Sequence, residues 1–304
     1  MGRFDRTPLH NACVRIGIID VGSNTMRLLV ADPCPRRGLQ PLHQAKARVG
    51  LAEPIQRVGH IPQGKLDEAE QHARLLAGEA RARGCASLEV IVTAPGRQSS
   101  NADELLVALQ RATGRAPRVL SGLDEGRYAH RGAVVDLTSD HGDVAVFDVG
   151  GGSTEIAIGG VLGAEWLASL DAGSLGLTVT TLGDAPGRSR IKRARRAIRA
   201  EFASLDVPEC DHAVAVGGSA RALGRIVDGP LTPEALGKVI SQSQGASIDQ
   251  LARRYSLGAQ RARTVLAGAI ILAEAARVAG RPLDVSSTGL REGLAAELLE
   301  LRAA

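Results

Sequence analysis

Residues 18–30 read IIDVGSNTMRLLV, and residues 146–158 read VFDVGGGSTEIAI. In both stretches an apolar run ends in Asp-Val-Gly, a turn of small and hydroxyl residues follows, and a second apolar run begins. This pattern is typical of two antiparallel strands joined by a tight hairpin. Asp20 and Asp148 occupy the same position in the two copies, 128 residues apart in the 304-residue chain. The repeat therefore predicts the same strand–turn–strand unit in each half.

Apolar periodicity divides the rest of the chain into alternating strands and helices, which predicts an α/β protein. In the first half we expect a helix over residues 62–84, whose apolar residues recur at three- and four-residue steps before Gly84. The other expected elements of this half are strands at 87–93 and 116–120 and a helix at 101–114.

The order restarts at residue 143, so two domains are expected. We place them at residues 1–123 and 124–304, with the last helix free to pack back on the first domain. The expected elements after the second hairpin are strands at 165–171, 212–218 and 283–287, a basic helix at 188–203, helices within 232–280 and a helix at 291–302.

The composition is that of a globular protein with aliphatic cores, because 44% of the residues are hydrophobic and only 2% are aromatic. The most apolar stretch, residues 264–280, carries Glu274 and Arg277 and is too short and too charged to cross a bilayer. No run typical of a signal peptide is visible, so no membrane partner and a cytoplasmic location with reduced thiols are expected. The cysteines lack metal-binding spacing: Cys13, Cys34, Cys85 and Cys210.

The net charge of +4 and the pI of about 9.1 suggest an anionic partner. Basic residues are most concentrated in residues 188–202, RSRIKRARRAIRAEF. This segment is either the solvated face of a helix or a positive track for a long polyanion. Nucleic acid is not expected as the partner, because single-strand binders stack bases on aromatic side chains that are nearly absent here.

The repeated hairpin has a chemical interpretation. Small residues let backbone N–H groups approach a phosphate, hydroxyls add donors, and an aspartate can hold a divalent cation or its waters. One such turn is also ordinary hairpin chemistry. Two copies that face each other would grip a phosphate chain from both sides, which favours a phosphate-binding function.

Six motifs carry a family resemblance: DVGSNTMRLLV (20–30), VTAPGRQSSN (92–101), LSGLDEGRY (120–128), DVGGGSTEI (148–156), VGGSARAL (216–223) and STGLREGL (287–294). In order and spacing they resemble the family of exopolyphosphatases and guanosine pentaphosphate phosphohydrolases (Ppx/GppA), in its short two-domain form. The resemblance implies two actin-like (RNase H-like) domains of the ASKHA superfamily with a catalytic cleft between them. It also implies hydrolysis of terminal phosphoanhydride bonds with Mg²⁺ or another divalent cation, and it leaves a homodimer open.

The resemblance implies roles for individual residues. Glu125 corresponds to the catalytic base, and Asp148 and Glu155 fall on the motif that positions metal and water, with Asp20 as their first-domain twin. The residues that match phosphate-binding segments are Ser23, Asn24, Thr25, Arg97, Asn101, Gly150, Gly151, Gly152, Ser153, Thr154, Gly217, Gly218 and Ser219.

The same residues have structural alternatives. Glu125 also suits the first turn of a helix, Asp148 an Asx-type turn, and Glu155 a solvent-facing strand position. Arg27 either reaches a phosphate or extends into solvent. The chain departs from the family pattern at Pro95-Gly96 and at Gly176, which stands where an Arg is common.

Three functions therefore remain open. The first is an exopolyphosphatase that releases orthophosphate from inorganic polyphosphate, and the second is a hydrolase of guanosine pentaphosphate. The third is a non-catalytic nucleotide- or polyphosphate-binding module, or a kinase, on the same fold. The basic helix at 188–199, together with Arg221 and Arg225, favours the first, because a long polyanion could follow these cations away from the reacting phosphate.

Overall fold

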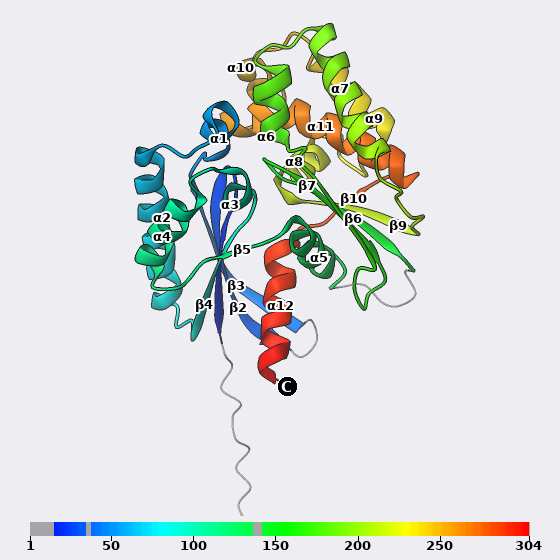
Figure 1. Cartoon of the computed structure of the whole chain (residues 1–304). Coiled ribbons are helices and arrows are strands. Elements are labelled where there is room, and N and C mark those ends of the chain that lie inside the picture. The colour runs from blue at the N-terminus through cyan, green and yellow to red at the C-terminus, as the bar shows by residue number, and fades with distance from the viewer. Residues whose placement is uncertain (1–14, 35–37, 136–141, 304) are drawn as a thin grey trace, which may run out of the picture.

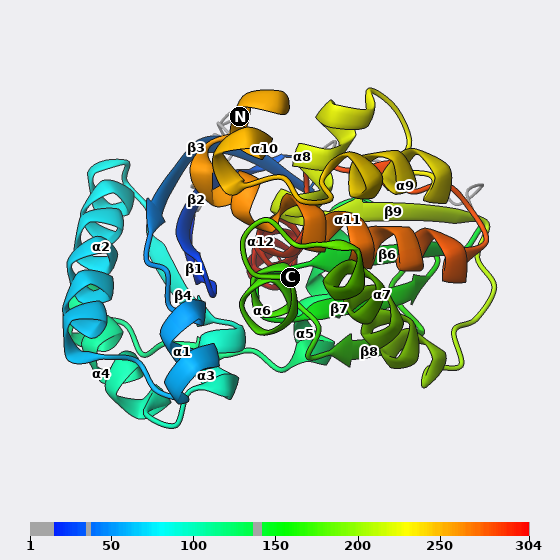
Figure 2. The same ribbon diagram turned by 90° about the horizontal axis from the view of Figure 1, so that it is seen from above.

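The computed structural model describes residues 15–34, 38–135 and 142–303, which form two five-stranded sheets with helices around them (Figures 1 and 2). The first sheet has the order β3-β2-β1-β4-β5. Strands β1, β2 and β3 are antiparallel neighbours, whereas β1, β4 and β5 are parallel. Their bounds are β1 (Ile16–Val21), β2 (Thr25–Cys34), β3 (Gly38–Arg48), β4 (Ser87–Val92) and β5 (Arg118–Val119).

The second sheet repeats this topology with the order β10-β9-β6-β7-β8. Its strands are β6 (Val144–Val149), β7 (Thr154–Gly159), β8 (Trp166–Leu170), β9 (His212–Val216) and β10 (Asp284–Val285). The two hairpins agree in register, because Asp20 pairs with Arg27 in the first and Asp148 pairs with Glu155 in the second. The sequence repeat is therefore also a structural repeat, and Arg27 occupies the position equivalent to Glu155.

Helices cover both faces of each sheet. The helices that follow the first hairpin are α1 (Ala52–Val58), α2 (Gln63–Ala82), α3 (Ala94–Gln98), α4 (Ala102–Thr113) and α5 (Gly122–Ala133). Those of the second half are α6 (Ser174–Leu177), the π-helical turn η2 (Thr178–Leu182), α7 (Arg188–Ala203), α8 (Gly217–Val227), α9 (Pro233–Gln242), α10 (Ile248–Arg254), α11 (Ala259–Ala279) and α12 (Leu290–Ala303).

The last helix of each half packs on the sheet of the other half. Helix α12 buries Leu290, Leu294 and Leu299 against Ile18 and Leu29 of the first sheet. Helix α5 lies against β6, β7 and β8 of the second sheet, and it also packs along α12 (Figure 1). The opposite faces are covered by α2 and α4 on the first sheet and mainly by α11, with α7 and α9, on the second. The α5–α12 pair therefore joins the two halves.

The α/β expectation and the two hairpins are confirmed, and the expected helices and strands are present with shifts of a few residues at their ends. The elements that were not expected are β3, α1, α3, α6, η2 and α8. The strand expected at 212–218 ends at Val216, and Gly217 and Gly218 form the first turn of α8. The expected domain boundary at residue 123 falls within the first turn of α5 and stays a prediction.

Within the described residues, no helix combines the length and apolarity needed to cross a membrane. Cys34, Cys85 and Cys210 are free thiols. Cys13 lies outside the described residues.

Candidate active site

A cavity lies between the two sheets, where the turns of the two hairpins meet. The turns are built alike, because the N–H of Gly22 donates to the carbonyl of Thr25 at 3.1 Å and that of Gly150 donates to Ser153 at 3.0 Å. They also touch, since a Cβ added to Gly152 would lie 2.9 Å from Ser23 Oγ. Larger residues in the second turn would push the two halves apart at this point.

The N-terminus of α8 forms another wall of the cavity through Gly217, Gly218 and Ser219. Gly217 has a φ of +89°, and a Cβ there would lie 2.7 Å from Asp148 Oδ1. Only glycine both adopts this positive φ readily and leaves room for the Asp148 carboxylate, because it has no Cβ. The first turn of this helix has no side-chain cap, so its N–H groups remain available for an anion.

Five carboxylates line the cavity, those of Asp20, Glu125, Asp148, Glu155 and Glu292. Burial raises the pKa of Asp20, Glu125, Asp148 and Glu155. Burial and then the neighbouring Glu155 raise the pKa of Glu125 well above its ordinary value. Burial and then Asp148 raise the pKa of Glu155 to about 8, and burial and then Asp20 raise that of Asp148 to about 6. The pKa of Asp20 is raised by burial, while Arg291 and Arg27 act in the opposite direction. Acidic groups with pKa values near neutrality in a cleft are suited to proton transfer.

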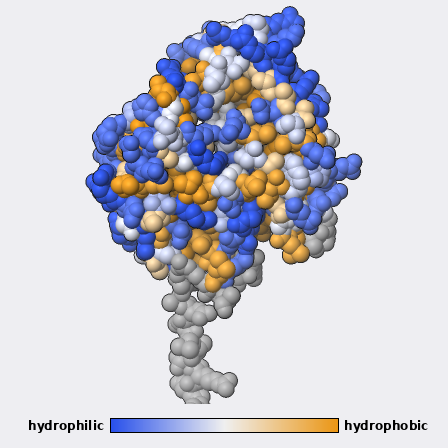
Figure 3. Space-filling model, viewed as in Figure 1, coloured by the Kyte–Doolittle hydropathy of each residue, from blue (hydrophilic) through white to orange (hydrophobic). Residues whose placement is uncertain are grey.

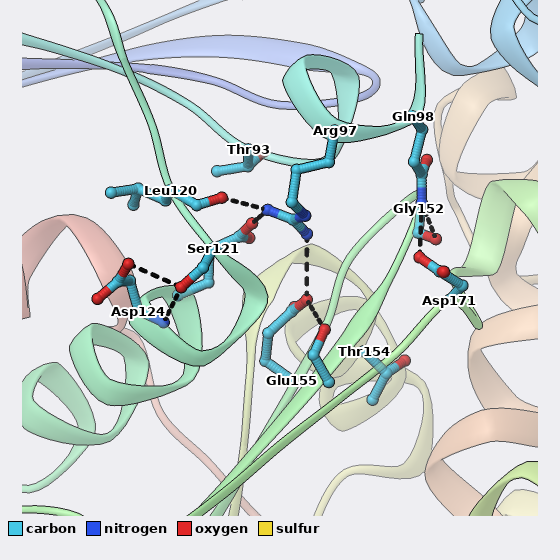
Figure 4. Close-up of polar contacts among 12 residues, drawn as sticks. Thr93, Arg97, Gln98, Leu120, Ser121, Asp124, Gly152, Thr154, Glu155 and Asp171 are labelled. Atoms are coloured by element: carbon cyan, nitrogen blue, oxygen red, sulfur yellow. Dashed lines mark hydrogen bonds and ion pairs between the residues drawn. The ribbon is translucent and has the colours of Figure 1, made fainter.

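Arg97, on α3, is partly buried and reaches two of these carboxylates, those of Glu125 and Glu155 (Figure 4 shows Arg97 and Glu155). One of its nitrogens donates to the carbonyl of Leu120 at 2.7 Å and forms an ion pair with Glu125. Its other terminal nitrogen lies 3.8 Å from Glu155 Oε1, which also accepts from Ser169 Oγ at 3.2 Å. Glu155 is only 2% exposed, so the solvent-facing interpretation of this residue is wrong.

Arginines from distant parts of the chain complete the cavity: Arg27 on β2, Arg221 on α8, Arg261 on α11 and Arg291 on α12. Burial, together with repulsion from the other arginines, lowers the pKa of Arg27, Arg221 and Arg261, that of Arg261 to about 10. The sequence had suggested Arg221 only as part of a positive track with the basic helix, and Arg291 lies in a motif but had been given no role in the site. Arg261 lies in none of the motifs, and only the tertiary fold identifies it.

Most of the expected site residues line this one cavity: Asp20, Ser23, Asn24, Thr25, Arg27, Glu125, Asp148, Gly150, Gly151, Gly152, Ser153, Glu155, Gly217, Gly218 and Ser219. Arg97 and Thr154 are not among its lining residues. The hydroxyl of Thr154 is buried and donates to the carbonyl of Ala172 at 2.6 Å, so it connects the start of β7 to the loop that follows β8. Asn101 exchanges two hydrogen bonds with the backbone of Ile61.

The basic helix α7 is not part of the site. It packs on α11 and η2, and none of its residues is among those that line the cavity. The exposed residues of α7 belong to the hydrophilic surface at the top of the molecule in Figure 3. Arg199 lies 3.6 Å from the buried Glu274, which gives part of the helix a structural role.

Asp20, Asp148 and Glu155 contribute oxygen atoms to the same cavity, which is the ligand type that Mg²⁺ prefers. In the part of the chain that the structure describes, no three acidic, histidine or cysteine side chains are grouped closely enough to form a metal cage. Mg²⁺ is usually held by one or two carboxylates together with waters and substrate phosphates, so the residues present fit such a site.

Comparisons with known proteins agree with this geometry. The model of the Ppx/GppA phosphatase family matches residues 30–302. Exopolyphosphatase 1 of Mycobacterium leprae is 30% identical over 95% of this chain and 91% of its own length, and the Mycobacterium tuberculosis protein of that name is also 30% identical. Among solved structures, the Aquifex aeolicus member of the Ppx/GppA family superposes with a TM-score of 0.81 at 25% identity, covering 96% of this chain and 99% of the other. The chain therefore belongs to the Ppx/GppA phosphatase family, a family of phosphoanhydride hydrolases.

Proposed function

We propose that this protein is a Mg²⁺-assisted exopolyphosphatase, which hydrolyses the terminal phosphoanhydride bond of inorganic polyphosphate and releases orthophosphate. The observation that carries the proposal is the position of the buried Glu125 in the wall of a cavity where two phosphate-type turns meet. Phosphoryl transfer depends mainly on positioning and charge stabilisation, and a carboxylate must orient or deprotonate the attacking water.

In this proposal different groups of residues bind the phosphates, balance their charge and hold the metal ion. The backbone of the turns at 22–25 and 150–153 and the first turn of α8 donate to phosphate oxygens. Arg27, Arg221, Arg261 and Arg291 balance the charge of the substrate. Asp148, with Asp20, would hold Mg²⁺ or its waters, and the ion would spread the charge of the transferring phosphoryl group when bound.

Glu125 acts as the general base because it is the carboxylate that Arg97 holds directly. Glu125 and Glu155 repel each other, so one of them holds a proton near neutral pH. The ion pair with Arg97 favours ionised Glu125, whereas Glu155 lies farther from the guanidinium and keeps the proton. Ionised Glu125 can then accept a proton from water, while Glu155 can donate a hydrogen bond.

The cavity favours an inorganic chain over guanosine pentaphosphate. No Phe, Tyr or Trp is among its lining residues, so the described cavity offers no aromatic surface on which a guanine could stack. A module that only binds phosphate is disfavoured for a different reason. Buried carboxylates repel an anionic ligand, so they would lower the affinity of a simple binding site.

Replacement of Glu125 tests the proposal. Glu125→Gln should lower orthophosphate release from polyphosphate by roughly 10²–10⁴ with little change in KM, because a general base acts mainly in the transition state. The matched control is Asp124→Asn on the same helix turn, since Asp124 accepts from Ser121 Oγ at 2.7 Å and does not line the cavity. Turnover of Glu125→Gln within a few-fold of the parent would contradict the role of Glu125. A parent protein that is faster on guanosine pentaphosphate than on polyphosphate would contradict the substrate.

A further inference from the structure

A second opening continues from the cavity and leaves it between the two halves of the molecule. Its walls are β3 of the first sheet on one side, and α8 with the start of α11 on the other. Figure 2 shows α10 and the start of α11 near the β2–β3 side of the first sheet. We call this opening the basic groove; besides arginines 27, 221, 261 and 291 of the cavity, it is lined by Lys46, Arg48 and Arg225.

Among the described residues, several cations of the basic groove lack an acidic partner in ion-pair range, although Arg291 pairs with Glu292 at 3.5 Å and Arg48 attracts the more distant Glu53. Asp and Glu are absent from its lining residues. Within residues 15–34, 38–135 and 142–303, Lys46, Arg48 and Arg225 form no ion pair within 4.0 Å, although arginines such as Arg127 and Arg263 are paired with glutamates. Unpaired cations held together repel one another, so such a surface is stabilised by binding an anion.

Two further features suit an extended anion. Helix α11 begins in the basic groove at Gly258 without a side-chain cap, so the first N–H groups of a 21-residue helix lie there. The basic groove shares Asn24, Thr25 and Arg27 with the cavity, so a chain whose end lies at the reacting position can continue into it. Phe, Tyr and Trp are absent from its lining residues as well.

We propose that the basic groove is a binding track for the part of a polyphosphate chain that extends beyond the reacting terminal phosphate. This inference rests on the proposed function for the identity of the chain. It assigns chain-length selectivity to Lys46, Arg48 and Arg225, and not to the basic helix α7. Tripolyphosphate would be held almost entirely in the cavity, whereas a longer chain would gain contacts along the basic groove.

The test removes one charge from each wall of the basic groove outside the cavity, in the double variant Lys46→Gln/Arg225→Gln. Both side chains are exposed, so the substitutions should leave the fold intact. The matched control is Lys192→Gln/Arg193→Gln on α7, which removes the same charge from equally exposed positions. Two quantities are measured at several salt concentrations: the Kd for long-chain polyphosphate by direct binding, and KM for long-chain polyphosphate and for tripolyphosphate.

In the groove variant we expect Kd and KM for long-chain polyphosphate to rise about tenfold. By analogy with single-stranded nucleic acids, the slope of log affinity against log salt should become shallower by about 1.4, because each removed contact contributes about 0.7. The ratio of kcat/KM between long chains and tripolyphosphate should fall by a similar factor, and the α7 control should match the parent.

Two different failures can be told apart. A groove variant with the Kd and salt slope of the parent would overturn the track, even if the parent hydrolyses polyphosphate well. A parent that binds long chains through the basic groove but releases no orthophosphate would overturn the proposed function and leave the track standing.

Discussion

The substitution Gly293→Ala tests how closely α5 and α12 pack. Gly293 lies on α12 and faces α5, where a Cβ would overlap the carbonyl oxygen of Tyr128 and lie 2.8 Å from the N–H nitrogen of Gly132. Real Cβ atoms keep more than 3.0 Å from such neighbours, and both obstacles are backbone atoms that cannot rotate away. The two helices would have to move apart by about 1 Å, which loosens the packing on both sides of the contact.

The expected loss of stability is the difference of two effects. Overpacking of this kind costs about 3 kcal/mol, whereas Ala in place of Gly inside a helix gains up to about 1 kcal/mol. A net loss of about 2 kcal/mol should lower Tm by roughly 3 °C, because the unfolding entropy of a chain of this length is about 0.6 kcal/mol per kelvin. Activity should fall as well, because α5 carries Glu125 and α12 carries Arg291.

The measurement is thermal unfolding of Gly293→Ala beside Gly78→Ala. Gly78 lies within α2, and a Cβ there would meet nothing within 4 Å. Gly78→Ala should therefore raise the free energy of unfolding by about 0.5–1 kcal/mol through helix propensity alone. If Gly293→Ala were also stabilising, the helices would not be in backbone contact, and the account of how the two halves are joined would be wrong.

Three further predictions use other residues. Asp148→Asn should weaken the Mg²⁺ dependence of activity in a metal titration and leave Tm equal or higher, because burial already disfavours the ionised carboxylate; an unchanged titration would contradict the metal role. Thr154→Val should cost about 1 kcal/mol in chemical denaturation with KM unchanged, because its hydroxyl bonds to Ala172; a raised KM would return Thr154 to the phosphate site. Burial raises the pKa of Glu297, but hydrogen bonds from Arg127 and Tyr128 outweigh it and leave the pKa below the usual 4.5. Its stabilising contribution should therefore be lost as pH falls below about 4.5, and Glu297→Gln should flatten that acid limb of the Tm profile.

The parts of the fold that were predicted from the sequence are those with a local signal. The hairpins at Asp20 and Asp148 combine apolar strands with a turn of small and hydroxyl residues that occurs twice, and α2 has a clear period and a stop at Gly84. Strand β3 was missed because its exposed residues, such as Lys46 and Arg48, alternate with small ones, and alternation is weak where one edge faces solvent.

The sequence predicted only those site residues that lie together in short motifs. The turns and Glu125 lie in short segments whose residue types indicate phosphate binding and catalysis. Nothing in the sequence distinguishes Arg261 from the other arginines, because only the packing of α11 beside α8 brings it to the cavity. The density of basic residues along the sequence also indicated the wrong segment as the anion-binding surface, because it does not show which residues the fold brings together. The residues of α7 form the densest basic run, but the cations that gather around the cavity come from β2, β3, α8, α11 and α12.

The exchange of α5 and α12 between the halves has a consequence during synthesis. The face of the first sheet that carries Ile18 and Ile91 is made early, but Leu290 and Leu294, which cover it, emerge about 200 residues later. At a ribosomal rate of about 5–20 residues per second, that face remains uncovered for roughly 10–40 s before α12 has been synthesised. The nascent chain therefore carries an exposed apolar sheet for most of its translation, which makes it a natural client for chaperones that bind at the ribosome.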